Sequence, residues 1–145
     1  MSADNKALVR RSIEEAINKG NLAVIDEITA SNYVYHEPTA GEVKGPDGLK
    51  KLIAMYRDAF PDVRMTIDDQ IAEGDRVVTR WTVRGTHRGE LMGIAASGKQ
   101  IVVTGIVITR FANGKAVEEW ENYDALGMMR QIGAIAATGK AARTG

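Results

Sequence analysis

The amino-acid sequence predicts an α+β fold in which N-terminal helices cover one face of a curved antiparallel sheet. Apolar residues recur at helical spacing in the first 60 residues, whereas residues 64–124 show the alternation that is typical of strands. Two turn sequences, Gly74-Asp75 and Asn113-Gly114, divide those strands into hairpins. We expect a pocket between the helical layer and the sheet.

Composition limits the partners and the location that we expect. The 145 residues fit one domain over positions 1–145, which is enough to bury roughly 70% of the surface of the unfolded chain. Lys+Arg and Asp+Glu both total 19, so no net charge attracts nucleic acid or an anionic membrane. The chain has no cysteine, which excludes disulfides and zinc–thiolate sites. Without a signal-peptide pattern or an apolar run of ~20 residues, we expect a cytoplasmic protein that binds a small molecule or another subunit.

The first 60 residues predict three helices. Residues 4–19 carry an apolar stripe with i, i+4, i+7 and i+8 spacing, and Gly20 ends it. A shorter helix is expected over residues 22–28. The third helix begins at Pro46, where the fixed φ of proline suits a first turn, and it ends before Pro61.

Between the second and third helices, residues 32–36 are aromatic and β-branched, and Glu37-Pro38 ends the run. This segment predicts a short edge strand or an extended turn.

After Pro61 the alternation predicts a hairpin around Gly74-Asp75, in which Asp69 faces Arg80 as a cross-strand ion pair. Residues 89–98 form a loop whose apolar side chains need a pocket mouth or a subunit interface to pack against.

Residues 100–111 and 115–124 predict a second hairpin around Asn113-Gly114. An uninterrupted ladder from this turn pairs Val107 with Trp120, Gly105 with Asn122 and Val103 with Asp124. Trp120, Asn122 and Asp124 then lie on the concave face, and the missing side chain of Gly105 leaves space beside them. A final helix is expected over residues 126–132, followed by a frayed tail at about 134–145.

Several segments in this order resemble the SnoaL-like polyketide cyclases, also called ester cyclases. The resemblance covers nearly the whole chain and is carried by these sequences: Gly45-Pro46-Asp47-Gly48-Leu49, Phe60-Pro61-Asp62, Ala72-Glu73-Gly74-Asp75-Arg76-Val77, Gly85-Thr86-His87-Arg88-Gly89-Glu90, Met92-Gly93-Ile94, Ser97-Gly98-Lys99, Asn113-Gly114-Lys115, Glu119-Trp120 and Asp124. It implies the cone-shaped, cystatin-like α+β fold shared with ketosteroid isomerase, scytalone dehydratase, limonene epoxide hydrolase and nuclear transport factor 2. It also implies a homodimer or a larger homo-oligomer that associates through the outer face of the sheet.

The same resemblance implies that Asp124 is the acid/base of an intramolecular aldol closure of a polyketide ester. Burial beside Trp120 and Val103 would raise its pKa toward the range that a general base needs. Alternatively, Asp124 caps the terminal helix. His87, which the family pattern also contains, would hydrogen-bond a substrate carbonyl or enolate, or tune Asp124; otherwise it is a histidine at a strand end.

His36 is a further candidate for the cavity, although a structural hydrogen bond to a carbonyl is an equal alternative. The remaining candidates would line the pocket and shape it: Trp81, Trp120, Asn122, Tyr33, Tyr56 and Met92. No local spacing of ligands indicates a metal site, and no glycine-rich loop joins a strand to a helix in the nucleotide-binding pattern. We expect no cofactor.

The leading hypothesis is a cofactor-independent enzyme that removes a proton α to a carbonyl in a hydrophobic or aromatic, polyketide-like substrate. One alternative is a hydrolase or isomerase of the epoxide, lactone or ketosteroid type on the same fold. That class needs an additional cationic or acidic partner, and Arg80, Arg84 and Arg110 do not share a face with Asp124 in the predicted register. Another alternative is a non-catalytic module for ligand binding or dimerisation.

Overall fold

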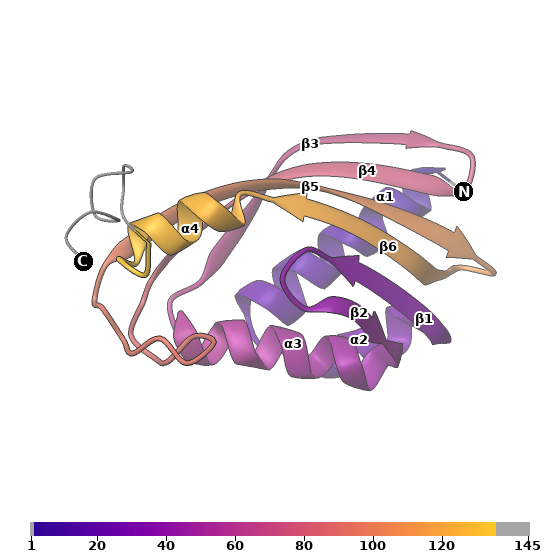
Figure 1. Ribbon diagram of the computed structural model, residues 1–145. Coiled ribbons are helices and arrows are strands. Elements are labelled where there is room, and N and C mark those ends of the chain that lie inside the picture. Colours follow the sequence, from indigo (N-terminus) through magenta and orange to yellow (C-terminus); the bar gives the residue numbers. More distant parts are fainter. Residues whose placement is uncertain (1, 136–145) are drawn as a thin grey trace.

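A computed structural model of the protein describes residues 2–135 and confirms the α+β class, with helices on one side of a strongly curved sheet (Figure 1). The predicted tail lies almost entirely outside the described residues. The helices are α1 (Ser2–Arg11), its π-helical continuation η1 (Ser12–Asn18), α2 (Ala23–Ile28), α3 (Gly45–Ala59) and α4 (Ala125–Gln131). The strands are β1 (Thr29–Glu37), β2 (Gly41–Lys44), β3 (Arg64–Glu73), β4 (Arg76–Thr86), β5 (Gln100–Ala112) and β6 (Lys115–Tyr123).

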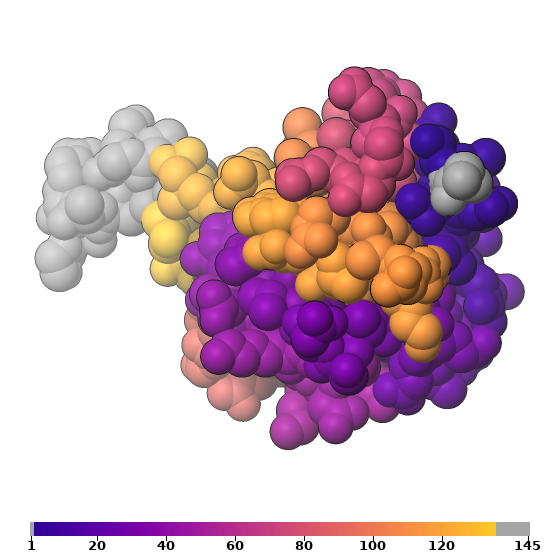
Figure 2. Space-filling model, turned by 90° about the vertical axis from the view of Figure 1, so that its right-hand side faces the viewer, coloured from indigo at the N-terminus to yellow at the C-terminus, as the bar shows by residue number. Residues whose placement is uncertain are grey.

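The strands form one open sheet in the order β2-β1-β6-β5-β4-β3. All neighbours are antiparallel except β1 and β6, which run parallel although they lie at opposite ends of the sequence. In Figure 2, β1 (violet) lies directly against the β5–β6 hairpin (orange), with β3 and β4 (pink) beyond it. The expectation of a short edge strand at 32–36 was therefore wrong. β1 is nine residues long and internal, and β2 forms the edge beside it.

The N-terminal helices pack on the concave face of the sheet, as predicted. Gly20 ends the first helix with a φ of +78°, a conformation that costs glycine little. The guanidinium of Arg57 in α3 donates to the carbonyl oxygens of Ile17 (2.5 Å) and Asn18 (3.1 Å) at the C-terminus of η1. These carbonyls lack helical partners, so Arg57 satisfies them and ties α3 to the first helix.

The first hairpin forms where it was predicted, but a β-bulge changes its ion pair. Asp69 lies opposite Arg80 in the ladder, yet the register shifts between Ile67 and Asp69 and leaves Asp68 as the extra residue. The guanidinium of Arg80 contacts the carboxylate of Asp68 at 3.6 Å, so Asp68 takes the ion pair that was assigned to Asp69. Bulges increase local twist and bending, which fits the curvature of this sheet.

The second hairpin turns at Asn113-Gly114, as predicted, with φ of 52° and 77° at the two residues. The ladder begins in the predicted register, since Phe111 pairs with Ala116. It then shifts by one residue, so that Arg110 pairs with Glu118 and Val117 is the extra residue.

This shift reverses the faces of the rest of β6, because successive strand residues point to opposite sides. Val107 pairs with Glu121 and Gly105 pairs with Tyr123. The predicted pairing of Trp120, Asn122 and Asp124 with Val107, Gly105 and Val103 was therefore wrong. Glu119, Glu121 and Tyr123 point to the concave side instead.

The space above Gly105 is filled by the indole of Trp81, its partner on β4. A Cβ atom added at Gly105 would overlap the Trp81 ring, far closer than van der Waals contact allows. The absence of a side chain at Gly105 therefore sets where Trp81 lies, and Trp81 is only 4% exposed.

Replacing Gly105 with alanine tests this packing. We expect Gly105→Ala to lower the free energy of unfolding by about 1–3 kcal/mol, because the indole must leave its position in a close-packed core. Urea denaturation followed by tryptophan fluorescence would measure the loss. Thr104→Ala, on the exposed neighbouring residue, is the matched control and should change stability by less than about 0.5 kcal/mol. Equal stability of the two variants would contradict the packing argument.

Candidate active site

A cavity of about 180 Å³ lies between the helices and the concave face of the sheet. Its walls are mainly apolar and come from all the helices and from every strand except β2. Its carboxyl and phenolic lining groups gather on β1, β6 and α3: Tyr35, Glu37, Tyr56, Glu119, Glu121 and Tyr123. The combination of apolar walls with a few convergent polar groups is typical of a small-molecule site.

Glu121 is the carboxyl group of this set that is hydrogen-bonded to two aromatic side chains. The indole Nε1 of Trp81 donates to Glu121 Oε2 at 2.6 Å, and the hydroxyl of Tyr35 donates to Oε1. Each carboxyl oxygen therefore receives one hydrogen bond and keeps a second acceptor position. Two rigid aromatic donors hold this side chain in one orientation toward the cavity.

Glu119 lies two residues earlier on the same face of β6. Thr109 Oγ1 donates to Glu119 Oε2 at 2.5 Å, and the hydroxyl of Tyr33 donates to Oε1. Tyr33 and Tyr35 have the same two-residue spacing on β1, so the parallel pairing of β1 with β6 aligns two tyrosines with two carboxyl groups.

Burial controls the protonation of both carboxyl groups. Desolvation raises the pKa of Glu121 to about 8, with the nearby charge of Glu119 adding to the effect and the hydrogen bond from Tyr35 opposing it. Desolvation also raises the pKa of Glu119, while hydrogen bonds from Thr109 and Tyr33 oppose that shift. A general base works best with a pKa near the working pH, so Glu121 has a suitable value.

A third carboxyl group, Glu37, lies at the end of β1 and joins a cluster of hydroxyl groups. It accepts hydrogen bonds from the backbone N–H groups of Thr39 (3.0 Å) and Ala40, and from Thr39 Oγ1 at 2.7 Å. The hydroxyl oxygens of Tyr56 and Tyr123 are 3.0 Å apart, and Thr39 Oγ1 is 3.0 Å from that of Tyr123.

Asp124 does not reach this cavity. Its residue is exposed, and its Oδ1 accepts a hydrogen bond from the backbone N–H of Gly127 at 2.9 Å. Asp124 is therefore the N-cap of α4, which is the alternative considered for it from the sequence. The inward placement of Asp124 depended on the regular register that Val117 interrupts.

His87 is fully buried, but it packs inside the protein beside Phe60 and does not line the cavity. Its Nδ1 accepts from the backbone N–H of Ser97 at 3.2 Å and lies 3.0 Å from Ser97 Oγ. These bonds hold the two ends of the 87–98 loop together. Its Nε2 has no hydrogen-bond partner among the described residues.

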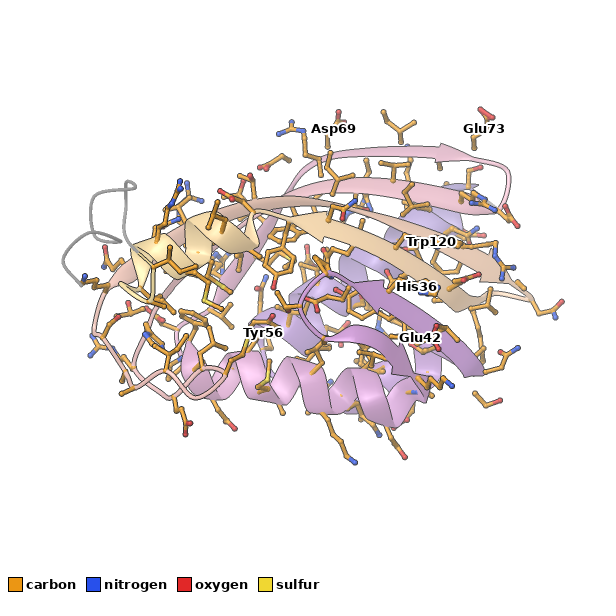
Figure 3. The ribbon with its side chains drawn as sticks, in the orientation of Figure 1. His36, Glu42, Tyr56, Asp69, Glu73 and Trp120 are labelled. Atoms are coloured by element: carbon orange, nitrogen blue, oxygen red, sulfur yellow. The ribbon has the colours of Figure 1, made fainter. Side chains whose placement is uncertain are left out.

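Of the predicted lining residues, Trp81 and Tyr56 do line the cavity. Tyr33 is buried and contacts Glu119, whereas Asn122 and Met92 are exposed. His36 and Trp120 stack on each other with ring centroids 5.8 Å apart, and Figure 3 shows them side by side on neighbouring strands. His36 Nε2 lies 2.8 Å from the Glu118 carboxylate. The stacked rings of His36 and Trp120 therefore lie beside a charged group outside the cavity.

Sequence reasoning missed Tyr35, Glu37, Glu119, Glu121 and Tyr123. A signal for them was present, because residues 33–37 read Tyr-x-Tyr-x-Glu and residues 119–123 read Glu-x-Glu-x-Tyr. Polar residues repeated every second position on two strands mark one face of each strand. Recognising that these faces meet required the parallel pairing, which has no local sequence signal.

Neither of two other site types is found in residues 2–135. No group of three or more histidine, aspartate or glutamate side chains is arranged to hold a metal ion there. No helix in that range has the length and apolar character to span a membrane.

The raised pKa of Glu121 predicts how stability varies with pH. Between its ordinary pKa of 4.5 and about 8, the folded protein keeps a proton that the unfolded chain has released. The free energy of unfolding should therefore fall as pH rises through this range, by up to ~1.4 kcal/mol per pH unit from this group. Urea denaturation at pH 5 and pH 8.5 should show a smaller fall for Glu121→Gln than for the wild type. An identical pH dependence in both proteins would contradict the buried position of this carboxyl group.

Known proteins resemble this chain in sequence and in structure. Residues 7–132 match the family model of the SnoaL-like polyketide cyclase. Aklanonic acid methyl ester cyclase DnrD of Streptomyces peucetius is 28% identical over 132 residues, which cover 87% of this chain and 88% of that protein. DauD of Streptomyces sp. (strain C5), another aklanonic acid methyl ester cyclase, is also 28% identical over 132 residues and covers 87% of this chain and 80% of its own length.

Solved structures agree with these relatives. TsrD from Streptomyces laurentii superposes with a TM-score of 0.83 at 30% identity, covering 92% of this chain and 97% of its own. Wild-type IdmH from Streptomyces antibioticus superposes with a TM-score of 0.78 at 31% identity, covering 88% and 97% respectively. Because the family model spans nearly the whole of the described fold, including β1, β6 and the cavity between the layers, the chain belongs to the SnoaL-like polyketide cyclase family.

Proposed function

We propose that this protein is a cyclase-type enzyme that closes a ring in a small polyketide-like ester, with Glu121 as its acid/base. The observation that supports this proposal best is the position of Glu121. Its carboxyl group lines an apolar cavity, two aromatic donors orient it, and burial raises its pKa to about 8. Membership of a cyclase family supports small-molecule cyclisation as the general activity.

The proposed reaction needs one base and no change in oxidation state. The Glu121 carboxylate removes a proton from a carbon α to a carbonyl, and the C–H electron pair becomes the enolate. The enolate carbon attacks a second carbonyl of the same molecule, forming a carbon–carbon bond while the carbonyl π-electrons move to its oxygen. That oxygen then takes the proton from the Glu121 carboxyl group. Atoms and charge balance without a coenzyme, so we propose cofactor-independent catalysis.

The partners of Glu121 suit this cycle. Hydrogen bonds from Trp81 and Tyr35 stabilise the carboxylate form, whereas desolvation favours the protonated form. Because these effects oppose each other, neither protonation state is strongly disfavoured near neutral pH. The named relatives are methyl ester cyclases, which supports an ester as the substrate.

We propose Glu121 in the role that the sequence suggested for Asp124. The two residues are three positions apart on the same chain segment, but only Glu121 lines the cavity. His87 then serves as a positioning residue for the 87–98 loop, because its ring bonds to Ser97.

Two variants separate the candidate bases. Glu121→Gln should lower kcat with aklanonic acid methyl ester, the substrate class of the named relatives, by at least about 100-fold, since general acid/base catalysis contributes roughly 10²–10⁴-fold. Asp124→Asn should keep activity within about twofold, because asparagine caps a helix as well as aspartate does.

Loss of activity in Asp124→Asn together with full activity in Glu121→Gln would reverse the assignment. If the wild-type protein binds the ester without converting it, the ligand-binding alternative replaces catalysis. Circular dichroism of each variant would confirm that it is folded.

We also propose that the protein forms a homodimer through the outer face of the sheet. An apolar row crosses this face along the ladder, with Ile71 opposite Val78, Val78 opposite Ile108 and Ile108 opposite Trp120. Ile71 is 62% exposed, and Ile106 nearby on β5 is 48% exposed. An apolar face of this kind on a monomer favours association.

Sedimentation would test this association. The wild-type protein should sediment at twice its chain mass of 15.7 kDa. Ile106→Glu, which places a charge at the centre of the interface, should sediment at the chain mass. Lys51→Glu, at an exposed position of α3 on the opposite side of the sheet, is the control and should remain dimeric. A monomeric wild-type protein would contradict the proposal.

A further inference from the structure

The Glu37 hydroxyl cluster, which consists of Glu37, Thr39, Tyr56 and Tyr123, lies beside the proposed base but takes no part in the proton transfer described above. Glu37, Tyr56 and Tyr123 line the cavity. Figure 3 shows Tyr56 between α3 and the sheet. The ring of Tyr123 lies against that of Trp81, the donor to Glu121, with centroids 6.3 Å apart. The cluster and the base therefore share one site.

The number of hydrogens in the cluster determines the direction of its hydrogen bonds. Each hydroxyl has one hydrogen to donate, and an ionised carboxylate only accepts. Among the hydroxyl groups, Thr39 makes the shortest contact to Glu37, at 2.7 Å, and its hydrogen points to that carboxylate. The 3.0 Å contact between Thr39 and Tyr123 then requires the hydrogen of Tyr123, and the 3.0 Å contact between the tyrosines requires that of Tyr56.

The resulting chain runs from Tyr56 to Tyr123, then to Thr39 and finally to the Glu37 carboxylate. The alternative for Tyr56 is donation directly to Glu37, but that distance is 3.5 Å and would leave the two tyrosine oxygens 3.0 Å apart without a hydrogen between them. All three hydroxyl hydrogens therefore point toward the carboxylate.

This direction leaves the Tyr56 oxygen as an acceptor. It donates its hydrogen to Tyr123, and the Thr39 hydroxyl, 3.4 Å away, has already given its single hydrogen to Glu37. Hydrogen-bond chains polarise their members, so a hydroxyl that donates into a chain ending at a carboxylate becomes a stronger acceptor. A ligand group that meets Tyr56 from the cavity thus finds an electron-rich oxygen and no available hydrogen.

We infer that Tyr56, supported by Tyr123, Thr39 and Glu37, is a specificity-determining residue that selects ligands carrying a hydroxyl group, such as a phenolic or enolic OH. A ligand hydroxyl can donate to Tyr56 without disturbing the chain. A bare carbonyl oxygen would need the Tyr56 hydrogen, and supplying it would break the bond to Tyr123. This inference deepens the proposed function and rests on it only in taking this cavity as the substrate site.

Equilibrium binding of small aromatic probes tests the selection without requiring turnover. The probes are 4-ethylphenol, which donates a hydrogen bond, 4-ethyltoluene, which has a methyl group in place of the hydroxyl, and 4-ethylbenzaldehyde, which only accepts. We expect 4-ethylphenol to bind about 3- to 10-fold more tightly than 4-ethyltoluene, the factor of one net hydrogen bond. The carbonyl probe should have no such advantage. Titration calorimetry at pH 6 keeps Glu121 mainly protonated, given its pKa of about 8.

Tyr56→Phe removes only the acceptor oxygen. It should abolish the preference for 4-ethylphenol and leave the affinity for 4-ethyltoluene unchanged, which also shows that the cavity is intact. Tyr123→Phe interrupts the chain while keeping Tyr56, and it should reduce the preference. Glu121→Gln is the matched control within the same cavity and should retain it.

Equal binding of the phenol and the hydrocarbon by the wild-type protein would overturn the inference, as would tighter binding of the aldehyde. A preference that survives in Tyr56→Phe but disappears in Glu121→Gln would place the hydroxyl at Glu121 and would also overturn it. These outcomes are independent of the activity of Glu121→Gln, so failure of the selection and failure of the proposed acid/base role can be distinguished.

Discussion

The chemistry of the cavity depends on one extra residue in the β5–β6 ladder. Because strand side chains alternate between faces, the bulge at Val117 decides the side of the sheet on which every later residue of β6 lies. It turns two glutamates and a tyrosine inward and turns Trp120 and Asn122 outward. Without that residue the cavity would have a tryptophan and an amide where it now has two buried carboxyl groups.

Burying carboxyl groups in an apolar cavity is unfavourable, and the parallel seam between β1 and β6 provides the compensation. Tyr33 and Tyr35 each donate to one glutamate of β6, and Thr109 and Trp81 donate to the other oxygens. Buried polar groups that are fully hydrogen-bonded make a rigid site, whereas unpaired ones strongly destabilise a fold. The same bonds that make burial tolerable therefore fix the geometry in which a proton can be transferred.

Local patterns predicted the helices and both hairpin turns, because apolar periodicity and glycine at positive φ act over a few residues. They could not predict the bulge, since Val117 and Glu118 fit either register by composition. They also gave no sign that β1 pairs with β6. Tyr33 and Glu119, which contact each other across this pairing, are 86 positions apart in the sequence. The predicted fold class was therefore confirmed, while the cavity residues depended on two long-range features. Trp81 and Tyr56 line the cavity because the hairpin and the helix that carry them form where the sequence predicted.

The role of Arg57 in joining α3 to the first helix has a consequence for the charge of the ligand. Arg57 is the one cationic residue among the described residues that line the cavity, and its guanidinium is already bonded to the carbonyls of Ile17 and Asn18. Three carboxyl groups line the same space. A free acid would bring a negative charge into this poorly hydrated space with no available cation to pair with it, a strongly unfavourable arrangement. A molecule whose acid is masked as an ester carries no such charge, so the electrostatics of the cavity favour the neutral form.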